Sequence, residues 1–414
     1  MKIAIIGSGI AGLSAAWYLG RDHQVTLYER GERLGMDAQT AQVTADDKTI
    51  AVNVPMRVFF PDYYPTLTSL YRELGVQFAP VHYAGSMSDF GGGTYFRYRN
   101  YWLGERAIPF LAGRSMVSGR AIKIGWELLR FAKQDGPAPE ASETLSEYLR
   151  RQAYSERFAE KFLYPAFSGI CTCSYDSVRA YPASLIKDYM SSGLLGSRVN
   201  RLVNGTQDAA KRMAKAAKHV RLGFDVRTVE MQDAGVGVMN GSGEAARFDH
   251  VVIATQANQA QRLLPASLAR EKDILSQFKY ESSVVAVHRD ERLAPINKSE
   301  WAPVNFLLSA KHDRPMASIW MNRIHPELNG KANLFETWNP FEQIPSEKLL
   351  LQAGFERPTV TPASLGAIDA LAELHQQTTR RVWFCGSYAA KGIPLLESAA
   401  LSAKRVADRI RLTS

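Results

Sequence analysis

The chain has 414 residues, of which 46% are hydrophobic and 22% are charged, and its formal net charge at pH 7 is +9. This size and composition are typical of a folded protein of two closely packed domains, and they exclude an intrinsically disordered chain. No stretch approaches the roughly eighteen continuous apolar residues of a membrane-spanning helix. Three cysteines (Cys171, Cys173 and Cys385) are too few for a disulfide framework. We therefore expect a cytoplasmic protein with ordinary buried thiols and without a metal site.

The N-terminal segment carries a dinucleotide-binding pattern. It consists of an apolar strand, a helix and a second apolar strand ending at Glu29, and its first turn reads Gly7-Ser8-Gly9-Ile10-Ala11-Gly12. Gly7 allows the tight turn, Gly9 lets a pyrophosphate approach the backbone, and Gly12 lets the helix pack on the strand. The N–H groups at the helix start, those of Ile10 and Ala11 included, are placed to hold phosphates. Glu29 is placed to accept hydrogen bonds from a ribose diol.

The residues after Glu29 indicate which dinucleotide the chain binds. Arg30, Arg33 and Gly35 lie in a stretch that resembles the FAD-binding extension of the flavin amine oxidase and phytoene desaturase superfamily, which wraps the pyrophosphate. The resemblance implies that this stretch binds FAD, with Arg33 on a phosphate and Gly35 close to the cofactor. The alternative is that Arg30 and Arg33 are solvated charges on a loop. Met36 stands where the superfamily usually has a second glycine, and methionine tolerates positive φ poorly.

The following segment is expected to pass the flavin and then to form helices. Arg57 is a candidate to face the flavin or a substrate carboxylate, and a structural ion pair is an equal alternative. The superfamily often has an acid and a glycine near here, whereas this chain has Asn53. Helical spacing before a glycine predicts a helix over residues 64–75, and three glycines predict a hairpin within 83–96. Residues 107–191 are expected to be helical in pieces.

Residues 95–133 combine basic and aromatic side chains. Between Arg97 and Lys133 there are eight bases but only two acids, Glu105 and Glu127, and aromatic residues are interleaved with the bases. This mixture would suit peripheral contact with the anionic inner face of a membrane. The alternative is a helical cap over the substrate cavity with a solvated basic face. Nucleic-acid binding is not expected, because no RNA- or DNA-binding motif accompanies the bases.

Residues 220–255 read as a short hairpin followed by an apolar strand. They resemble the strands that cover adenine in the same superfamily, and the resemblance makes Val226, Ala254 and Thr255 cofactor contacts.

Near the C-terminus a strand ends in Gly386-Ser387, and a helix begins near Leu396 and runs to about residue 410. The resemblance places Gly386 and Ser387 at the ribityl-phosphate region. It also aims the helix N-terminus at the flavin pyrimidine, where the positive end of the helix stabilises negative charge. Ser387 replaces the acid that usually follows the glycine.

Candidates for the chemistry itself are few. Tyr164, Trp320 and Trp338 are candidates to line an aromatic cavity, although large aromatic side chains more often fill cores. His288 and His325 are candidate bases on position alone, and a lone histidine is more often structural. No catalytic triad is expected, because hydride transfer to a flavin needs no protein nucleophile.

Together these motifs predict an α/β fold with a Rossmann-like FAD-binding domain, an interleaved α+β substrate domain and a helical subdomain. The FAD-binding domain is expected to be discontinuous, and the substrate domain with its helical cap fills the gaps. The expected ranges are 1–60, 199–264 and 366–414 for the first domain, and 61–198 and 265–365 for the second.

The middle of the chain resembles a narrower group, the bacterial and fungal predicted FAD/NAD(P)-binding oxidoreductases, some of which appear beside fatty-acid-modifying enzymes. This implies an FAD-dependent oxidoreductase of lipid metabolism that desaturates or otherwise oxidises a small lipophilic substrate of acyl or polyene type. Two alternatives stay open. One is an FAD-dependent amine oxidase that uses O2. The other is a flavin-free protein that binds a lipid or a prenylated partner, which the departures at Met36, Asn53 and Ser387 suggest.

Overall fold

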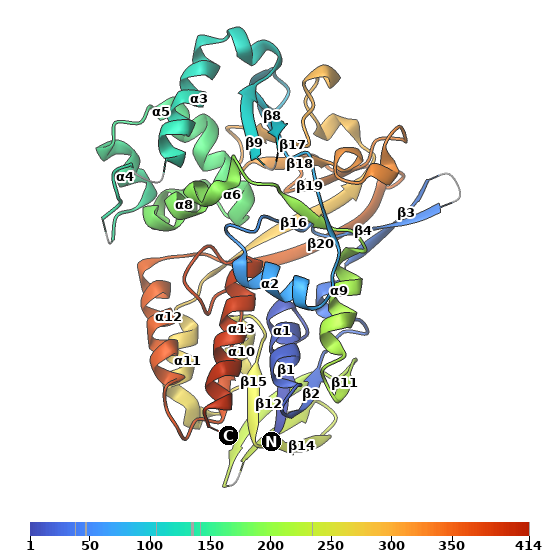
Figure 1. Ribbon diagram of the computed structural model, residues 1–414, viewed down its shortest axis with the longest axis vertical. Helices are drawn as coiled ribbons and strands as arrows, with labels where there is room; N and C mark the ends of the chain where they lie inside the picture. Colours follow the sequence, from blue (N-terminus) through green and yellow to red (C-terminus); the bar gives the residue numbers. More distant parts are fainter. Residues whose placement is uncertain are drawn as a thin grey trace.

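The computed structural model describes residues 1–37, 39–45, 48–104, 106–133, 136–140, 142–233 and 235–413, so Glu105 of the basic segment lies outside the described residues. The molecule has two parts, one above the other in Figure 1, and both termini lie at the far end of the lower part. The lower part holds a parallel sheet of the nucleotide-binding type, and the upper part holds a larger mixed sheet with a helical subdomain. This confirms the predicted α/β fold.

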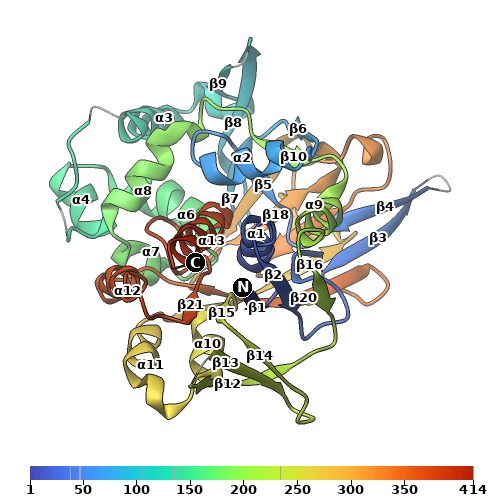
Figure 2. The same ribbon diagram turned by 60° about the horizontal axis from the view of Figure 1, so that its bottom comes forward.

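The lower part is built on a five-stranded parallel sheet with the order β11-β2-β1-β15-β21. Ile3 and Ile5 of β1 face the layer of α1, α9 and α13, whereas Ala4 and Ile6 face the layer of β12–β14 and α10–α12 (Figure 2). Because both faces are covered, the central strands are continuous apolar runs. The elements are β1 (Lys2–Ile6), α1 (Ile10–Leu19), β2 (Gln24–Tyr28), α9 (Gly205–Ala214), β11 (His219–Arg221), β12 (Val226–Gln232), β13 (Gly235–Asn240), β14 (Ala245–Phe248), β15 (His250–Ile253), α10 (Ala257–Leu263), α11 (Ala269–Ser276), α12 (Pro362–Leu374), β21 (Val382–Phe384) and α13 (Leu396–Arg411).

The upper part is built on an eight-stranded mixed sheet with the order β20-β16-β19-β18-β17-β7-β8-β9. Its strands come from two distant segments, which meet where β7 pairs in parallel with β17. Helices α3–α8 form the helical subdomain beside this sheet (Figure 1). The elements are β7 (Gly85–Asp89), β8 (Thr94–Leu103), β9 (Arg106–Leu111), α3 (Gly119–Ala132), α4 (Leu145–Arg151), α5 (Glu156–Phe158), α6 (Tyr164–Cys171), α7 (Tyr175–Ala180), α8 (Ala183–Tyr189), β16 (Tyr280–His288), β17 (Val304–Leu308), β18 (Met316–Trp320), β19 (Phe335–Trp338) and β20 (Leu349–Pro358).

Short elements join the two parts. Three strands, β5, β10 and β6, form a small antiparallel sheet, and β3 and β4 form a projecting hairpin (Figure 1). The Glu397 carboxylate of α13 accepts the N–H groups of Thr66 and Leu67 at the start of α2, both at 3.0 Å, and so fixes α2 on α13. The elements are β3 (Thr40–Ala45), β4 (Lys48–Asn53), β5 (Val58–Phe59), α2 (Pro65–Glu73), β6 (Phe78–Pro80) and β10 (Asn200–Leu202).

Two local expectations differ from the structure. The helical stretch expected from residue 107 begins only with the 3₁₀ segment Gly113–Val117 and with α3 at Gly119, because residues 106–111 form β9 and pair with β8. In addition α11, expected in the substrate domain, buries Leu275 in the core of the lower part. Among the described residues no helix is both long and apolar enough to cross a membrane.

Candidate functional site

The glycine turn between β1 and α1 has the backbone that its sequence predicts. Gly7 has a φ of +99°, which L side chains rarely adopt. A Cβ atom at Gly12 would lie 1.8 Å from the Gly7 carbonyl oxygen, so the helix lies directly against the turn. A Cβ atom at Gly9, by contrast, would have no heavy atom within 4 Å. The turn is therefore closely packed at Gly7 and Gly12 and open at Gly9.

Hydrogen bonds fix the acid and its extension against this turn. The Glu29 carboxylate accepts the N–H and the hydroxyl of Ser8, at 3.0 and 2.6 Å, and the N–H of Gly31 at 2.9 Å. The Ser8 hydroxyl in turn accepts the N–H of Gly35 at 2.7 Å. Sequence reasoning missed Ser8, although a small hydroxyl residue between two turn glycines is a usable signal. Through it, the turn orients both Glu29 and Gly35.

Met36 fits this arrangement without backbone strain. Its side chain is buried, and its N–H donates to the Ser8 carbonyl at 3.3 Å. Among the described residues the non-glycine residues with positive φ are Ala153, Thr172 and Asn339, so Met36 does not need the conformation that a glycine would supply. The extension therefore keeps its position against the turn even though Met36 replaces the second glycine.

A cavity of about 360 Å³ opens beside the glycine turn and reaches into the upper part. The predicted cofactor residues that line it come from the segments that follow β1, β15 and β21, whose carboxyl ends meet at one edge of the parallel sheet. Open α/β sheets bind ligands at this edge. These residues are Gly9, Ile10, Ala11, Ala254, Thr255, Gly386, Ser387 and Leu396.

Two helices direct uncapped N-termini at this cavity. Helix α1 begins after Gly9 and α13 begins after Leu395, and neither N-cap residue supplies a side-chain acceptor. The N–H groups of a first helical turn have no partner within the helix, and the helix dipole favours negative charge beside them. Together with the open side of Gly9, this arrangement fits the pyrophosphate of a dinucleotide at α1 and an electron-rich ring at α13.

The other predicted cofactor residues lie outside the cavity wall. Arg30 and Arg33 are exposed on the loop between Glu29 and Gly35. Val226 begins β12 and is buried in the core on the opposite face of the sheet. Their contacts with a cofactor stay predictions.

Two arginine side chains enter the cavity from segments 300 positions apart, Arg57 and Arg357. Arg357 donates to the Ile170 carbonyl at 3.1 Å, and its guanidinium lies 5.6 Å from the centre of the Trp338 ring. Within the described part of the chain, neither arginine forms an ion pair with a carboxylate. Burial lowers the pKa of both groups, yet a guanidinium stays protonated in proteins. The wall of the cavity therefore carries two half-buried positive charges.

Glu336 of β19 is the carboxyl group whose charge would raise the pKa of Arg57. It does not neutralise the positive charge of Arg57. Its buried carboxyl group accepts the Met56 N–H at 2.8 and 2.9 Å. Burial raises the pKa of Glu336 to about 8, against the opposing effects of the Met56 N–H and the Arg57 charge. Glu336 is therefore mostly a neutral acid at pH 7, and it positions the backbone beside Arg57.

We predict that Glu336→Gln stabilises the protein increasingly as the pH rises from about 5 to about 8. The folded wild type keeps a proton on Glu336 that the unfolded chain releases, so its stability falls across this window by up to about 1.4 kcal/mol per pH unit. Glutamine still accepts the Met56 N–H but cannot ionise. Urea unfolding of both proteins across the window measures the difference. Stability curves that stay parallel would contradict a buried neutral acid.

The part of the cavity farther from the glycine turn has an aromatic wall. Burial raises the pKa of Tyr83 to about 12 and those of Tyr64 and Tyr189 further, so these phenols stay neutral. Trp338, a sequence candidate, belongs to this wall. The tyrosines were missed because they come from separate segments without a motif. The wall consists of Tyr64, Tyr83, Tyr189, Phe306, Trp338 and Phe355.

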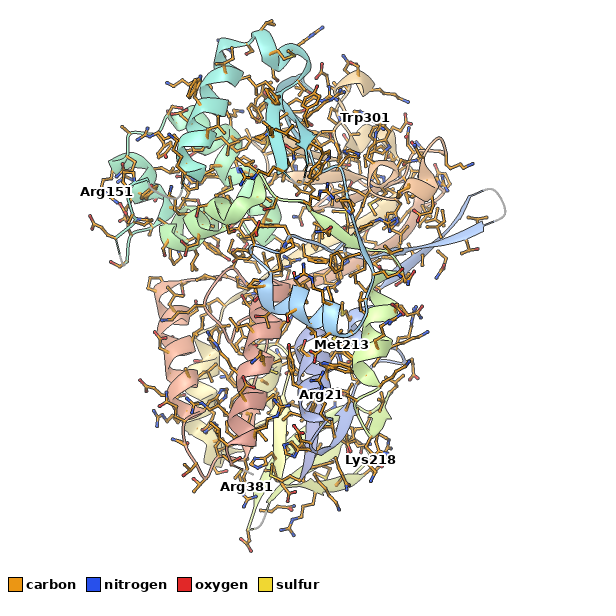
Figure 3. The ribbon with its side chains drawn as sticks, viewed as in Figure 1. Arg21, Arg151, Met213, Lys218, Trp301 and Arg381 are labelled. Atoms are coloured by element: carbon orange, nitrogen blue, oxygen red, sulfur yellow. The ribbon has the colours of Figure 1, made fainter. Side chains whose placement is uncertain are left out.

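Two aromatic candidates lie elsewhere. Tyr164 is buried in α6 beneath the Arg179 guanidinium, which lies 5.3 Å from its ring centre. Trp320 packs edge-on against Trp301 at 5.3 Å, and Figure 3 labels Trp301 in the upper part of the molecule. Neither Tyr164 nor Trp320 lines the cavity. Both serve local packing, as large aromatic side chains commonly do.

The histidine candidates do not line the cavity either. The His288 ring is held by the Thr337 hydroxyl at 2.7 Å and by the Asp290 N–H at 3.0 Å, and burial lowers its pKa to about 4. His325 lines a separate small pocket that it shares with Arg57, and burial lowers its pKa to about 4 as well. The cysteines are buried free thiols, and the described residues contain no cluster of metal ligands.

Comparison with known proteins agrees with the dinucleotide geometry. Residues 5–74 match the family model of an NAD(P)-binding Rossmann-like domain. Over 77 residues the chain is 35% identical to an L-amino-acid oxidase from Pseudechis australis. That match covers 18% of this chain and 14% of the oxidase.

Three solved structures share the whole fold. A candidate protoporphyrinogen oxidase from Exiguobacterium is 18% identical with a TM-score of 0.68, and the match covers 100% of this chain and 99% of that one. A putrescine oxidase bound to putrescine is 17% identical with a TM-score of 0.63 and the same coverage. A CLA-producing fatty acid isomerase from P. acnes is 13% identical with a TM-score of 0.66, covering 98% of both chains. At such identities the likeness shows the fold alone.

Proposed function

We propose that this chain, which has the fold of the flavin amine oxidase superfamily, is an FAD-dependent oxidoreductase that oxidises a lipophilic substrate bearing a carboxylate. The observation that carries the proposal is the pair of guanidinium groups in the cavity, those of Arg57 and Arg357, which are half-buried and have no ion-pair partner among the described residues. Burying a charge without a partner is costly. Such charge in a largely aromatic cavity is suited to an anionic group that arrives with the ligand.

Different residues around the cavity would bind the cofactor phosphates, the substrate carboxylate and the apolar part of the substrate. When bound, FAD would supply the redox chemistry by accepting a hydride from the substrate. The N–H groups of Ile10 and Ala11 would hold the cofactor phosphates, next to the open side of Gly9. Arg57 and Arg357 would bind the substrate carboxylate as charge-assisted donors. The aromatic wall would enclose the apolar part of the substrate and exclude water, while its neutral tyrosines stay protonated.

For the reaction itself we propose a desaturation or a related oxidation of an acyl-type substrate. The aromatic and aliphatic lining supports an apolar chain, and the guanidinium pair supports an acid at its end. A fatty acid isomerase shares the fold, which is consistent with this substrate class.

An amine oxidase that uses O2 is the second candidate, favoured by the putrescine oxidase and L-amino-acid oxidase similarities. Two positive charges in the cavity wall would repel a protonated amine, so this activity requires an uncharged amine or one that carries a carboxylate. A flavin-free binding protein is the third candidate. Of the departures that suggested it, Met36 is unstrained, and Asn53 accepts the Thr206 N–H at 2.9 Å as a structural residue.

Visible spectroscopy with anaerobic mixing tests the proposed function. The purified protein is expected to show a flavin spectrum, alone or after addition of FAD, that bleaches with a long-chain fatty acid but not with putrescine. Bleaching by amines only, with prompt peroxide once oxygen is admitted, would favour the amine oxidase instead. A visible spectrum that stays blank after FAD is added would reject both enzymes.

A further inference from the structure

The hairpin β8–β9 and α3 lie in the upper part of the molecule, away from the nucleotide sheet (Figure 1), and they expose a concentrated apolar surface. The hairpin β8–β9, the 3₁₀ segment Gly113–Val117 and α3 form it, and we call residues 99–133 the distal surface. Among the described residues seventeen large apolar side chains are exposed, and nine of them lie between Tyr101 and Leu129. Apolar exposure gathered in this way marks an interaction surface.

The hairpin mixes apolar and basic side chains on one face. Strand alternation exposes Tyr101 and Leu103 of β8 together with Ile108 and Phe110 of β9. Tyr101 pairs with Ile108, and its ring centre lies 5.5 Å from that of Phe110. The same face carries one exposed arginine at an end of each strand, Arg99 opposite Phe110 and Arg106 opposite Leu103. The face is therefore apolar along its middle and cationic at two corners.

Helix α3 adds a second apolar stripe. Ile122, Trp126 and Leu129 recur at helical spacing and are exposed, Trp126 to 71%. Other residues of α3, such as Ile124 and Phe131, are buried. The helix thus has an apolar stripe that the protein does not cover, flanked by exposed lysine and arginine, which is the composition of helices that lie in a membrane interface.

Among the described residues of the distal surface, no exposed acid balances the positive charge. Seven of the eight bases between Arg97 and Lys133 are exposed, and none of these seven forms an ion pair within the described residues. Arg97 is the exception, because it is buried and donates to the carbonyls of Ser299 and Trp301. Glu127 is buried and accepts the N–H and hydroxyl of Ser155. The surface is therefore both apolar and cationic.

An apolar path leads inward from this surface. A groove of about 160 Å³ between α3 and β9 shares Phe96, Tyr98 and Leu128 with a small inner cavity of about 50 Å³. The inner cavity in turn shares Tyr83, Leu194, Phe306 and other residues with the main cavity. Three neighbouring spaces, divided by the side chains that they share, therefore lie in a row from the distal surface to the aromatic wall.

We propose that the distal surface docks on an anionic phospholipid bilayer and that the substrate enters through the groove between α3 and β9. The exposed apolar side chains would reach the acyl boundary while the bases contact lipid phosphates. A nucleic acid would use the bases but would leave exposed aliphatic residues such as Leu103 and Leu129 without a role. The entry route rests on the proposed function, whereas docking does not.

Flotation of the full chain with vesicles tests docking. The protein is expected to float with phosphatidylcholine–phosphatidylglycerol vesicles in a salt-sensitive manner and not with phosphatidylcholine alone. Trp126→Ser with Leu129→Ser should lower vesicle partitioning at least roughly tenfold. Ile296→Ser is the matched control, because Ile296 is 70% exposed outside the distal surface, and it should change nothing.

A charge pair of variants completes the flotation test. Arg120→Glu with Lys123→Glu should lower partitioning by about 30-fold or more, and Arg270→Glu with Lys279→Glu, exposed bases elsewhere, should not. Absence of flotation, or equal losses in the control variants, would overturn docking. Retention on RNA or DNA without flotation would overturn it too and assign the surface to nucleic acid.

The entry route needs a separate variant. A Cβ atom at Gly125 would lie 3.7 Å from Leu111, so Gly125→Phe can extend into the groove without a clash at its root. Uptake of a fluorescent polyene fatty acid from vesicles should slow at least roughly tenfold while flotation is unchanged. Unchanged uptake would overturn the route. If the protein floats with vesicles but no fatty acid bleaches its flavin absorbance, the proposed function is rejected and docking is still supported.

Discussion

Gly9→Val is expected to abolish flavin retention while leaving the fold intact. The backbone at Gly9, with φ −65° and ψ 179°, suits any L-residue, and a Cβ atom there meets no protein atom within 4 Å. The added methyl groups would instead occupy the space where a pyrophosphate approaches. We expect FAD binding to weaken by about 3 kcal/mol or more, which is on the order of 100-fold. The poorer N-cap should cost at most about 1 kcal/mol of stability.

Gly12→Ala is the informative partner of this variant. Its Cβ would lie 1.8 Å from the Gly7 carbonyl oxygen, so the backbone of the turn must move. The cost of such overpacking is about 1–3 kcal/mol or more and falls on the protein without any ligand. Thermal unfolding without FAD, followed by FAD titration, separates the two effects. Normal FAD affinity in the Gly9→Val protein would refute the assignment of the open side to phosphate.

Arg357→Gln is expected to weaken binding of a long-chain carboxylate about 100-fold and to leave binding of its methyl ester unchanged. The guanidinium is half-buried in the cavity, and in the described residues its contacts are a carbonyl and an aromatic ring rather than a carboxylate. A ligand carboxylate would therefore be its partner, and the ester cannot take that role. Glutamine removes a half-buried charge that lacks a partner, so stability without ligand should not fall.

Titration of the acid and the ester, followed by flavin absorbance, measures this separation. Arg314→Gln is the matched control, because Arg314 pairs with Glu281 at 3.2 Å and Asp313 at 3.0 Å and does not line the cavity. That variant should lose some stability and keep the affinity for the acid. If acid and ester weakened equally in Arg357→Gln, the arginine would be a packing residue and the carboxylate would lose its proposed anchor.

The dinucleotide half of the site was accessible from sequence because its parts are adjacent in the chain. Gly7, Gly9 and Gly12 lie in one strand-turn-helix unit, and each has a different local reason to be glycine. Gly7 has a positive φ, Gly9 faces open space, and Gly12 lies against the turn. Glu29 directly follows β2, the next strand in the chain, and its carboxylate accepts hydrogen bonds from Ser8 in the turn. The strands before Ala254 and Gly386 were also readable, because buried parallel strands are continuous apolar runs.

The sequence did not predict which side chains of residues 95–133 are exposed. Composition shows that bases and aromatic residues are mixed there, but it does not say which of them are covered. Phe96 and Arg97 are buried, whereas Phe110 and Trp126 are exposed. Phe110 is exposed because β9 is a strand rather than part of a helix, which changes the side-chain period there. Arg97 is covered by the segment of Ser299 and Trp301, about 200 positions away in the chain.

The sequence by itself therefore determined the α/β fold and the position of the dinucleotide turn, because local backbone geometry and a short hydrophobic period encode both. Only the tertiary structure decided what lies opposite that turn. Arg57, Glu336 and Arg357 carry no motif, and they become a site because β19 and β20 bring distant segments to one cavity. Long-range packing also buries Glu336, and that burial raises the pKa of its carboxyl group and keeps it mostly neutral.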